Sequence, residues 1–85
     1  AKGYNALHTA VQFKRFLLAS YLLRSGAHVD AADNDAHTAL HWAAYVGDAR
    51  LTRLLINHNA DPTRVDDRGM NPMHWAAAKG FIDVV

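Results

Sequence analysis

Histidine is the side chain in this sequence with the most obvious capacity for chemistry. The 85 residues include six histidines and no cysteine, so a zinc site would need imidazole and carboxylate ligands. His37 and His41 have the i, i+4 spacing that puts two zinc ligands on one helix face. Thr38, however, is a good helix N-cap that leaves His37 outside the helix, and no glutamate is present for an H-E-x-x-H site. The sequence therefore predicts no bound metal and no cofactor.

The sequence does not favour nucleophilic or acid–base catalysis either. The two serines lie in one expected helix and lack the strand–turn–helix elbow that exposes a catalytic serine. The carboxylate pairs Asp33/Asp35 and Asp66/Asp67 lie in turn-forming segments, where solvated aspartates bend the chain. The sequence also lacks a glycine-rich phosphate loop and a dinucleotide fingerprint. We therefore expect no catalytic and no cofactor-binding residue in this chain.

Charge and hydropathy exclude two further classes of partner. Nine lysines and arginines balance eight aspartates, for a formal net charge of +1. Between Asp48 and Arg68 basic residues alternate with aspartates, which is typical of a solvated face and not of a nucleic-acid groove. The longest apolar-rich run, from Phe16 to Leu23, is too short to cross a bilayer. We expect no nucleic-acid partner and no direct membrane insertion by this segment.

A repeat must place these candidate residues in space. Asn5, Thr38 and Asn71 stand 33 residues apart, and each opens a similar tetrapeptide ending in histidine. His41-Trp42-Ala43-Ala44 likewise returns as His74-Trp75-Ala76-Ala77. The same offset relates further pairs, namely Ala10 with Ala43, Leu18 with Leu51, Leu22 with Leu55 and Ala27 with Ala60. The register indicates one domain of repeats spanning about residues 3–35, 36–68 and, truncated, 69–85.

Each repeat predicts two short helices and a hairpin loop. The three polar residues 33 apart are good N-caps for the first helices, and Pro72 suits the first helical position. Gly47 and Gly80 suit the left-handed ends of those helices. A second helix is expected from Asp48 to about Asn57, with leucines in an i, i+3, i+4 pattern. The residues expected to end the second helices are Gly26 and Asn59.

The repeated segments resemble the ankyrin signature T-P-L-H-x-A, whose period is also 33 residues. They read Thr38-Ala39-Leu40-His41-Trp42-Ala43-Ala44 and Asn71-Pro72-Met73-His74-Trp75-Ala76-Ala77. The resemblance covers Gly3 to Val85 and implies an all-α ankyrin-repeat solenoid of helix–turn–helix pairs with β-hairpin loops. It also implies that one histidine per repeat is structural, hydrogen-bonding backbone near the hairpin; these are His8, His41 and His74.

The sequence departs from the ankyrin pattern at two positions. Lys14 stands where the glycine between the helices is expected, and Ala36 replaces the hairpin glycine kept at Gly3 and Gly69. A left-handed non-glycine residue costs about 1–2 kcal/mol, so we expect an altered turn in repeat 1. Because the third repeat stops at Val85, we also expect a piece of a longer array. Such a piece would be marginally stable and would pack on neighbouring repeats of its parent chain.

A narrower resemblance concerns the ankyrin repeats of DHHC-type palmitoyltransferases. The similar segments are Ala10-Val11-Gln12-Phe13, Ser20-Tyr21-Leu22-Leu23, Trp42-Ala43-Ala44-Tyr45 and Thr52-Arg53-Leu54-Leu55. In those membrane enzymes the repeats lie on the cytosolic face and capture substrates, while a separate Cys-rich domain transfers the acyl group. The resemblance implies a cytoplasmic location, or the cytosolic face of a membrane, and an S-palmitoyltransferase parent whose catalytic domain lies outside this chain.

The ankyrin resemblance also implies a binding surface, because one face of the first helices lines a concave groove in such arrays. Trp42, Tyr45 and Val46 share that face at i, i+3 and i+4. The residues expected to bind a partner are Tyr4, Thr9, Gln12, His37, Trp42, Tyr45, Val46, Met70, Trp75 and Lys79. In the alternative interpretation, Trp42 and Trp75 only stack on each other and thicken a thin core.

Three functions remain open from the sequence. The first is a protein–protein interaction module that binds a protein or extended peptide on the concave groove and hairpin tips. The second is the substrate-recruiting part of a membrane S-palmitoyltransferase. The third is an architectural spacer within a long array. The first two differ in whether transmembrane spans and an Asp-His-His-Cys motif follow in the parent chain.

Overall fold

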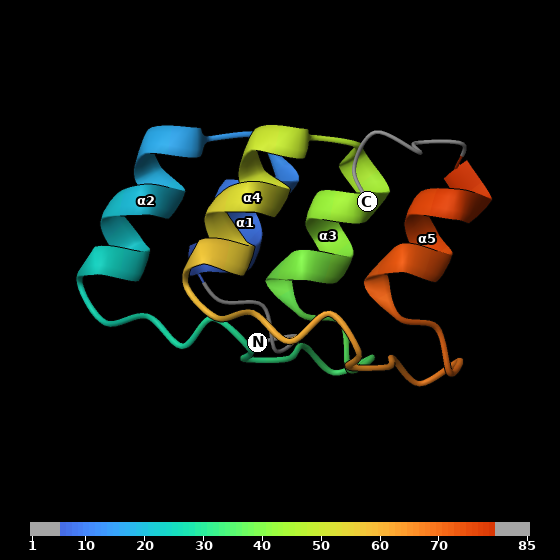
Figure 1. Ribbon diagram of the computed structural model, residues 1–85. Helices are drawn as coiled ribbons and strands as arrows, with labels where there is room; N and C mark the ends of the chain where they lie inside the picture. Colours follow the sequence, from blue (N-terminus) through green and yellow to red (C-terminus); the bar gives the residue numbers. More distant parts are fainter. Residues whose placement is uncertain (1–5, 80–85) are drawn as a thin grey trace.

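The computed structural model describes residues 6–79 of the chain, and over that range it contains five helices and no strand (Figure 1). These are α1 (Ala6–Gln12), α2 (Phe16–Arg24), α3 (Ala39–Val46), α4 (Ala49–Asn57) and α5 (Pro72–Lys79). The all-α prediction is confirmed. The predicted N-cap Asn5 and the predicted helix end at Gly80 lie outside the described residues.

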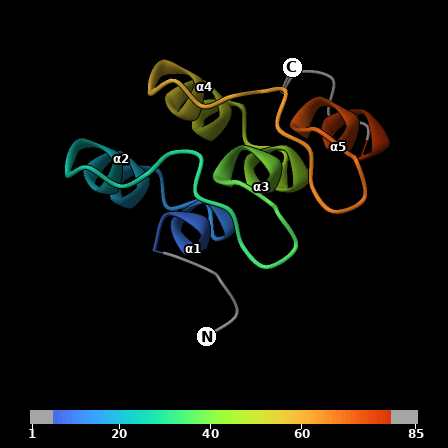
Figure 2. The same ribbon diagram turned by 90° about the horizontal axis from the view of Figure 1, so that it is seen from below.

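The helices form two layers (Figure 2). The first helix of each repeat, α1, α3 or α5, lies in one layer, with α3 packed between α1 and α5. The second helices α2 and α4 form the other layer, where α2 packs on α1 and α4 packs on α3. The long loops that link one repeat to the next all lie at one end of the helices (Figure 1). This arrangement is a short helical solenoid.

Helix α3 begins and ends at the predicted residues. Thr38 forms a capping box with His41: the Thr38 hydroxyl accepts from the His41 N–H at 3.4 Å, and the Thr38 N–H donates to His41 Nδ1 at 3.1 Å. At the other end Gly47 is left-handed, with φ of 76°, and its N–H donates to the Ala43 carbonyl. Ala39 and Ala43 are fully buried, which lets the neighbouring helices approach closely.

Helix α4 likewise matches its prediction. The Asp48 carboxylate caps it by accepting from the N–H groups of Arg50 and Leu51 at 3.0 and 3.2 Å. Leu51 and Leu55, which lie on one helix face, are completely buried in the main core. Asn59 then adopts a φ of 69°, as expected for a left-handed helix end.

The expectation of an altered turn in repeat 1 is wrong. Lys14 has φ of 60° and Ala36 has φ of 64°, so both adopt the left-handed conformation that the ankyrin pattern assigns to glycine. The Arg15 N–H donates to the Ala10 carbonyl at 2.7 Å, in the way that Asp48 donates to Ala43 at 3.3 Å. The surrounding hydrogen bonds and packing therefore maintain the turn against a local cost of about 1 kcal/mol.

Candidate binding surface

The histidine that recurs in each repeat holds the loops to the helices. His41 is 2% exposed, and its Nε2 lies 2.8 Å from the Met70 carbonyl in the next loop. Because Nδ1 accepts from the Thr38 N–H, the ring proton lies on Nε2 and is donated to Met70. Burial lowers the pKa of His41, although the bond to Met70 opposes this shift. His41 is thus a neutral, structural imidazole.

The other two recurring histidines also bond to backbone. Nε2 of the buried His8 lies 2.7 Å from the Ala31 carbonyl. His74 Nδ1 accepts from the Asn71 N–H at 3.1 Å, and the Asn71 side chain accepts from the His74 N–H at 2.8 Å. The structure therefore agrees with the structural role that the ankyrin resemblance implies for this position.

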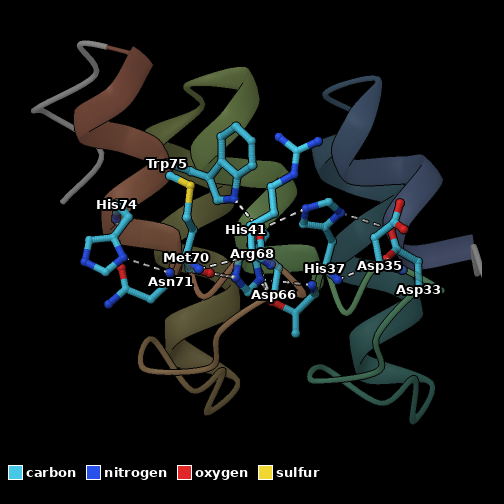
Figure 3. A network of polar contacts seen from close by, with 11 residues as sticks. Asp33, Asp35, His37, His41, Asp66, Arg68, Met70, Asn71, His74 and Trp75 are labelled. Carbon is cyan, nitrogen blue, oxygen red and sulfur yellow. Dashed lines mark hydrogen bonds and ion pairs between the residues drawn. The ribbon is translucent and has the colours of Figure 1, made fainter.

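A buried carboxylate, Asp66, links two successive loops (Figure 3). Its Oδ1 accepts from the N–H groups of Arg68 and Met70 at 2.9 and 3.0 Å, which closes the loop of repeat 3. Its Oδ2 lies 3.0 Å from His37 Nε2 and accepts from the Trp75 indole N–H at 2.8 Å. One side chain thus joins the loop that precedes α3 to the helix α5.

Asp66 is held in its charged form. Burial would raise its pKa, but hydrogen bonds from Met70, Trp75 and Arg68, together with nearby His37, outweigh that effect and lower the pKa to about 2. The prediction that these turn aspartates are solvated is therefore only half right. Asp35 and Asp67 are exposed, whereas Asp33 and Asp66 are buried.

Asp33 plays the corresponding part in the preceding loop. Its Oδ1 accepts from the N–H groups of Asp35 and His37, both at 2.9 Å, and its Oδ2 lies 3.6 Å from His37 Nδ1. Ligand atoms of Asp33, Asp35 and His37 lie within 4.8 Å of one another, a grouping that could in principle hold a metal. Most of these atoms already serve the turn or the bond to Asp66, so the cluster has a structural explanation.

Three aromatic residues and two histidines surround a small pocket beside this network. The pocket has a volume of about 80 Å³ and an apolar lining, and its walls are His37, His41, Trp42, Tyr45 and Trp75. Tyr45 is 44% exposed, so the pocket borders on solvent. Trp42 also packs on the main core, and Trp75 packs on Ala44 and Ala76.

The structure brings together four of the ten predicted binding residues, His37, Trp42, Tyr45 and Trp75. Met70 supplies the carbonyl that His41 binds. The other described positions, Thr9, Gln12 and Val46, do not line the pocket. Tyr4 lies outside the described residues, and of Lys79 only its place in α5 is described.

Two residues of the surface were not anticipated as such. His41 lines the pocket as well as bonding to backbone, and Asp66 orients both His37 and Trp75. For Asp66 the sequence does contain an indication. Asp33 and Asp66 are 33 residues apart, so this aspartate is part of the repeat pattern and not an isolated turn residue.

Comparison with known proteins identifies the class that this fold and its histidine-bonded loops define. The chain belongs to the ankyrin-repeat family, because the family model described as ankyrin repeats in three copies matches residues 7–85. The palmitoyltransferase AKR1 of Mortierella alpina is 44% identical over 61 residues, covering 71% of this chain and 11% of that protein. The AKR1 palmitoyltransferase of Eremothecium gossypii is also 44% identical over 61 residues, covering 71% of this chain and 8% of its own length.

A relative of another kind is the nuclear factor NF-kappa-B p105 subunit of Mus musculus, 48% identical over 60 residues, with 69% of this chain and 6% of that protein covered. Both the ankyrin resemblance and the narrower resemblance to palmitoyltransferase repeats are thereby confirmed. The chain spans only a small part of the length of these relatives. Among the described residues, none of the helices is long and apolar enough to cross a membrane.

Proposed function

We propose that this chain binds an extended peptide or a protein segment across the surface formed by its first helices and hairpin loops. Ankyrin repeats generally mediate protein interactions, which supports protein binding as the general function. The aromatic pocket between α3, α5 and the loop of His37 supports the location of the binding surface. Tryptophan and tyrosine at the centre of a surface are typical of binding hot spots.

The form of the surface supports a peptide anchored at one point. The rings of Trp42 and Trp75 are half-buried and held in place by packing, so little conformational entropy is lost when a ligand contacts them. Tyr45, which lines the same pocket, is partly exposed. Two further predicted residues of the groove, Thr9 and Gln12 on α1, are exposed and would contact the peptide farther along.

Recruitment of substrates for a palmitoyltransferase is the second candidate. The likeness to the AKR1 palmitoyltransferases favours it, since those proteins contain a stretch that is 44% identical to this one over 61 residues. In that case the peptide would belong to the enzyme's substrate, and the repeats would lie in the cytoplasm or on the cytosolic face of a membrane. The sequence of the parent chain tests this candidate, which requires membrane spans and an Asp-His-His-Cys motif.

Selection of ligands from a random peptide display library tests the binding function itself. We expect enriched peptides whose affinity falls at least tenfold in Tyr45→Ala, a substitution at a partly exposed ring. Tyr21→Ala is the matched control, because Tyr21 is 61% exposed on α2 in the other layer. Selected peptides that bind both variants as tightly as the parent chain would contradict the proposal.

A further inference from the structure

Four of the five rings that line the pocket form a closed circuit around it. Going round it, the ring centroids are 5.9 Å apart for His37 and Trp42, 6.0 Å for Trp42 and Tyr45, 5.8 Å for Tyr45 and Trp75, and 5.9 Å for Trp75 and His37. Each ring is steeply inclined to the next, at 67°, 80°, 78° and 69°. The arrangement has nearly equal sides and nearly perpendicular neighbours, as the walls of a box have.

The dimensions of this box suit a cation. For four centroids at the corners of a square with this side, the centre would lie about 4 Å from each ring, inside the roughly 6 Å range of cation–π attraction. The pocket volume of about 80 Å³ is roughly half of the 150 Å³ at which an apolar cavity holds benzene. It therefore fits a compact group of a few heavy atoms.

The charges behind the walls favour a positive occupant. The Asp66 carboxylate, ionised and buried, accepts from Trp75 Nε1 and lies 3.0 Å from His37 Nε2, so two of the four walls rest on one negative charge. By accepting from the indole N–H, this anion makes the Trp75 ring more electron-rich. The two loops over residues 33–37 and 66–70 contain four aspartates against one arginine, Arg68, which is exposed, and one histidine, His37.

We infer that this aromatic box binds the methylated ammonium group of a lysine in a peptide partner, an inference that rests on the proposed peptide-binding function. The lining is apolar and so compensates poorly for the lost hydration of an unmodified lysine, whose compact ammonium is strongly hydrated. Methyl groups remove its N–H donors, lower the cost of dehydration and contact the ring faces, while the positive charge is kept. The choline group of a lipid has the same chemistry, but the box lies beside the loops and first helices, on the surface proposed for an extended peptide.

Nuclear magnetic resonance of the chain with short synthetic peptides tests the inference directly. Both tryptophans of the chain line the pocket, so the two indole N–H signals report on its occupancy. The probes are three Gly-Lys-Gly peptides with blocked ends, one carrying trimethyl-lysine, one unmodified lysine, and one a neutral isostere with carbon in place of the ammonium nitrogen. We expect the trimethyl-lysine peptide to bind at least tenfold more tightly than the other two, with its methyl proton signal shifted upfield by the rings.

Variants of the exposed wall complete the test. Tyr45→Leu, which removes one ring, should weaken binding of the trimethyl-lysine peptide at least tenfold, whereas Tyr45→Phe and the distant control Tyr21→Leu should leave it within twofold. Equal binding of the neutral isostere or of unmodified lysine would overturn the inference. Tighter binding of phosphocholine than of the trimethyl-lysine peptide would also overturn it. Unmodified library peptides that still require Tyr45 would show, in those cases, that the proposed peptide-binding function stands without methyl-lysine recognition.

Discussion

The junction between repeats 1 and 2 and the junction between repeats 2 and 3 share one backbone design and differ in their side chains. In each loop a buried aspartate accepts two N–H groups of its own turn, Asp33 in one case and Asp66 in the other. The positions of the aromatic box differ, however: at the 33-residue offset Thr9 of repeat 1 corresponds to Trp42, and Gln12 corresponds to Tyr45. The repeat framework is therefore common to both junctions, whereas the aromatic box belongs to the second alone among the described residues.

The largest effect should follow from removing the carboxylate that serves the second junction. Asp66→Ala deletes two turn hydrogen bonds, the bond from the Trp75 indole and the contact to His37. Because groups left buried without partners add to this loss, we expect unfolding free energy to fall by about 3 kcal/mol. Asp33→Ala, the matched change in the first junction, should cost about half as much. Equal losses in chemical denaturation would mean that the link to Trp75 contributes nothing.

The second-largest effect should follow from removing a wall of the aromatic box. Trp42→Ala or Trp75→Ala should weaken the binding of a selected peptide by about 2 kcal/mol. Arg53→Ala, on the exposed face of α4, should change the affinity little. Since both tryptophans also pack on buried residues, only variants that retain their circular dichroism and melting are informative. If folded variants of both tryptophans bind like the parent chain, recognition lies on the hairpin tips instead.

Acid should lower the stability of the junction between repeats 2 and 3. The folded-state pKa of Asp66 is about 2, below the value of about 4 for an unfolded aspartate, so its contribution is fully present above pH 4. As the pH falls from about 4 towards 2 the unfolded chain takes up a proton first, and this contribution is lost. Denaturation measured at successive pH values should show a shallower acid dependence for Asp66→Asn than for the parent chain. Parallel curves for the two would contradict the assignment.

The smallest effect concerns the turns between paired helices, where Lys14 and Gly47 occupy equivalent positions. Both are left-handed, with φ of 60° and 76°. Lys14→Gly should therefore stabilise the chain by up to about 1 kcal/mol, and Gly47→Ala should destabilise it by a similar amount. Thermal melting measures both. A loss of stability in Lys14→Gly would show that the lysine side chain makes contacts that outweigh the strain.

The sequence was sufficient for features that depend on the chain's own neighbourhood. Thr38, Gly47, Asp48 and Asn59 have helix-end roles that can be recognised from residue type and position. The same local reasoning failed at Lys14, because the conformation there is imposed by hydrogen bonds and packing that a propensity does not contain.

The sequence predicted several residues of the candidate site but not how their rings are arranged. The 33-residue offset places Trp42 and Trp75 in one row, and helical spacing adds Tyr45. Neither pattern states whether the rings stack or enclose a space, since that depends on inclination angles between side chains of separate elements. Nor does either pattern show that Asp66 is buried beneath them, because an aspartate in a turn is more often solvated.

Both tryptophans of the chain lie at the second junction, and this gives the protein an unevenly placed optical label. Intrinsic fluorescence excited at the red edge of the indole band reports mainly on repeats 2 and 3, and it senses the first repeat only through the packing of Trp42 on the main core. Far-ultraviolet dichroism, by contrast, sees every helix. A solenoid that frays from its first repeat would therefore lose ellipticity with a smaller change in emission than one that frays from its third, so the two signals together reveal which end opens first.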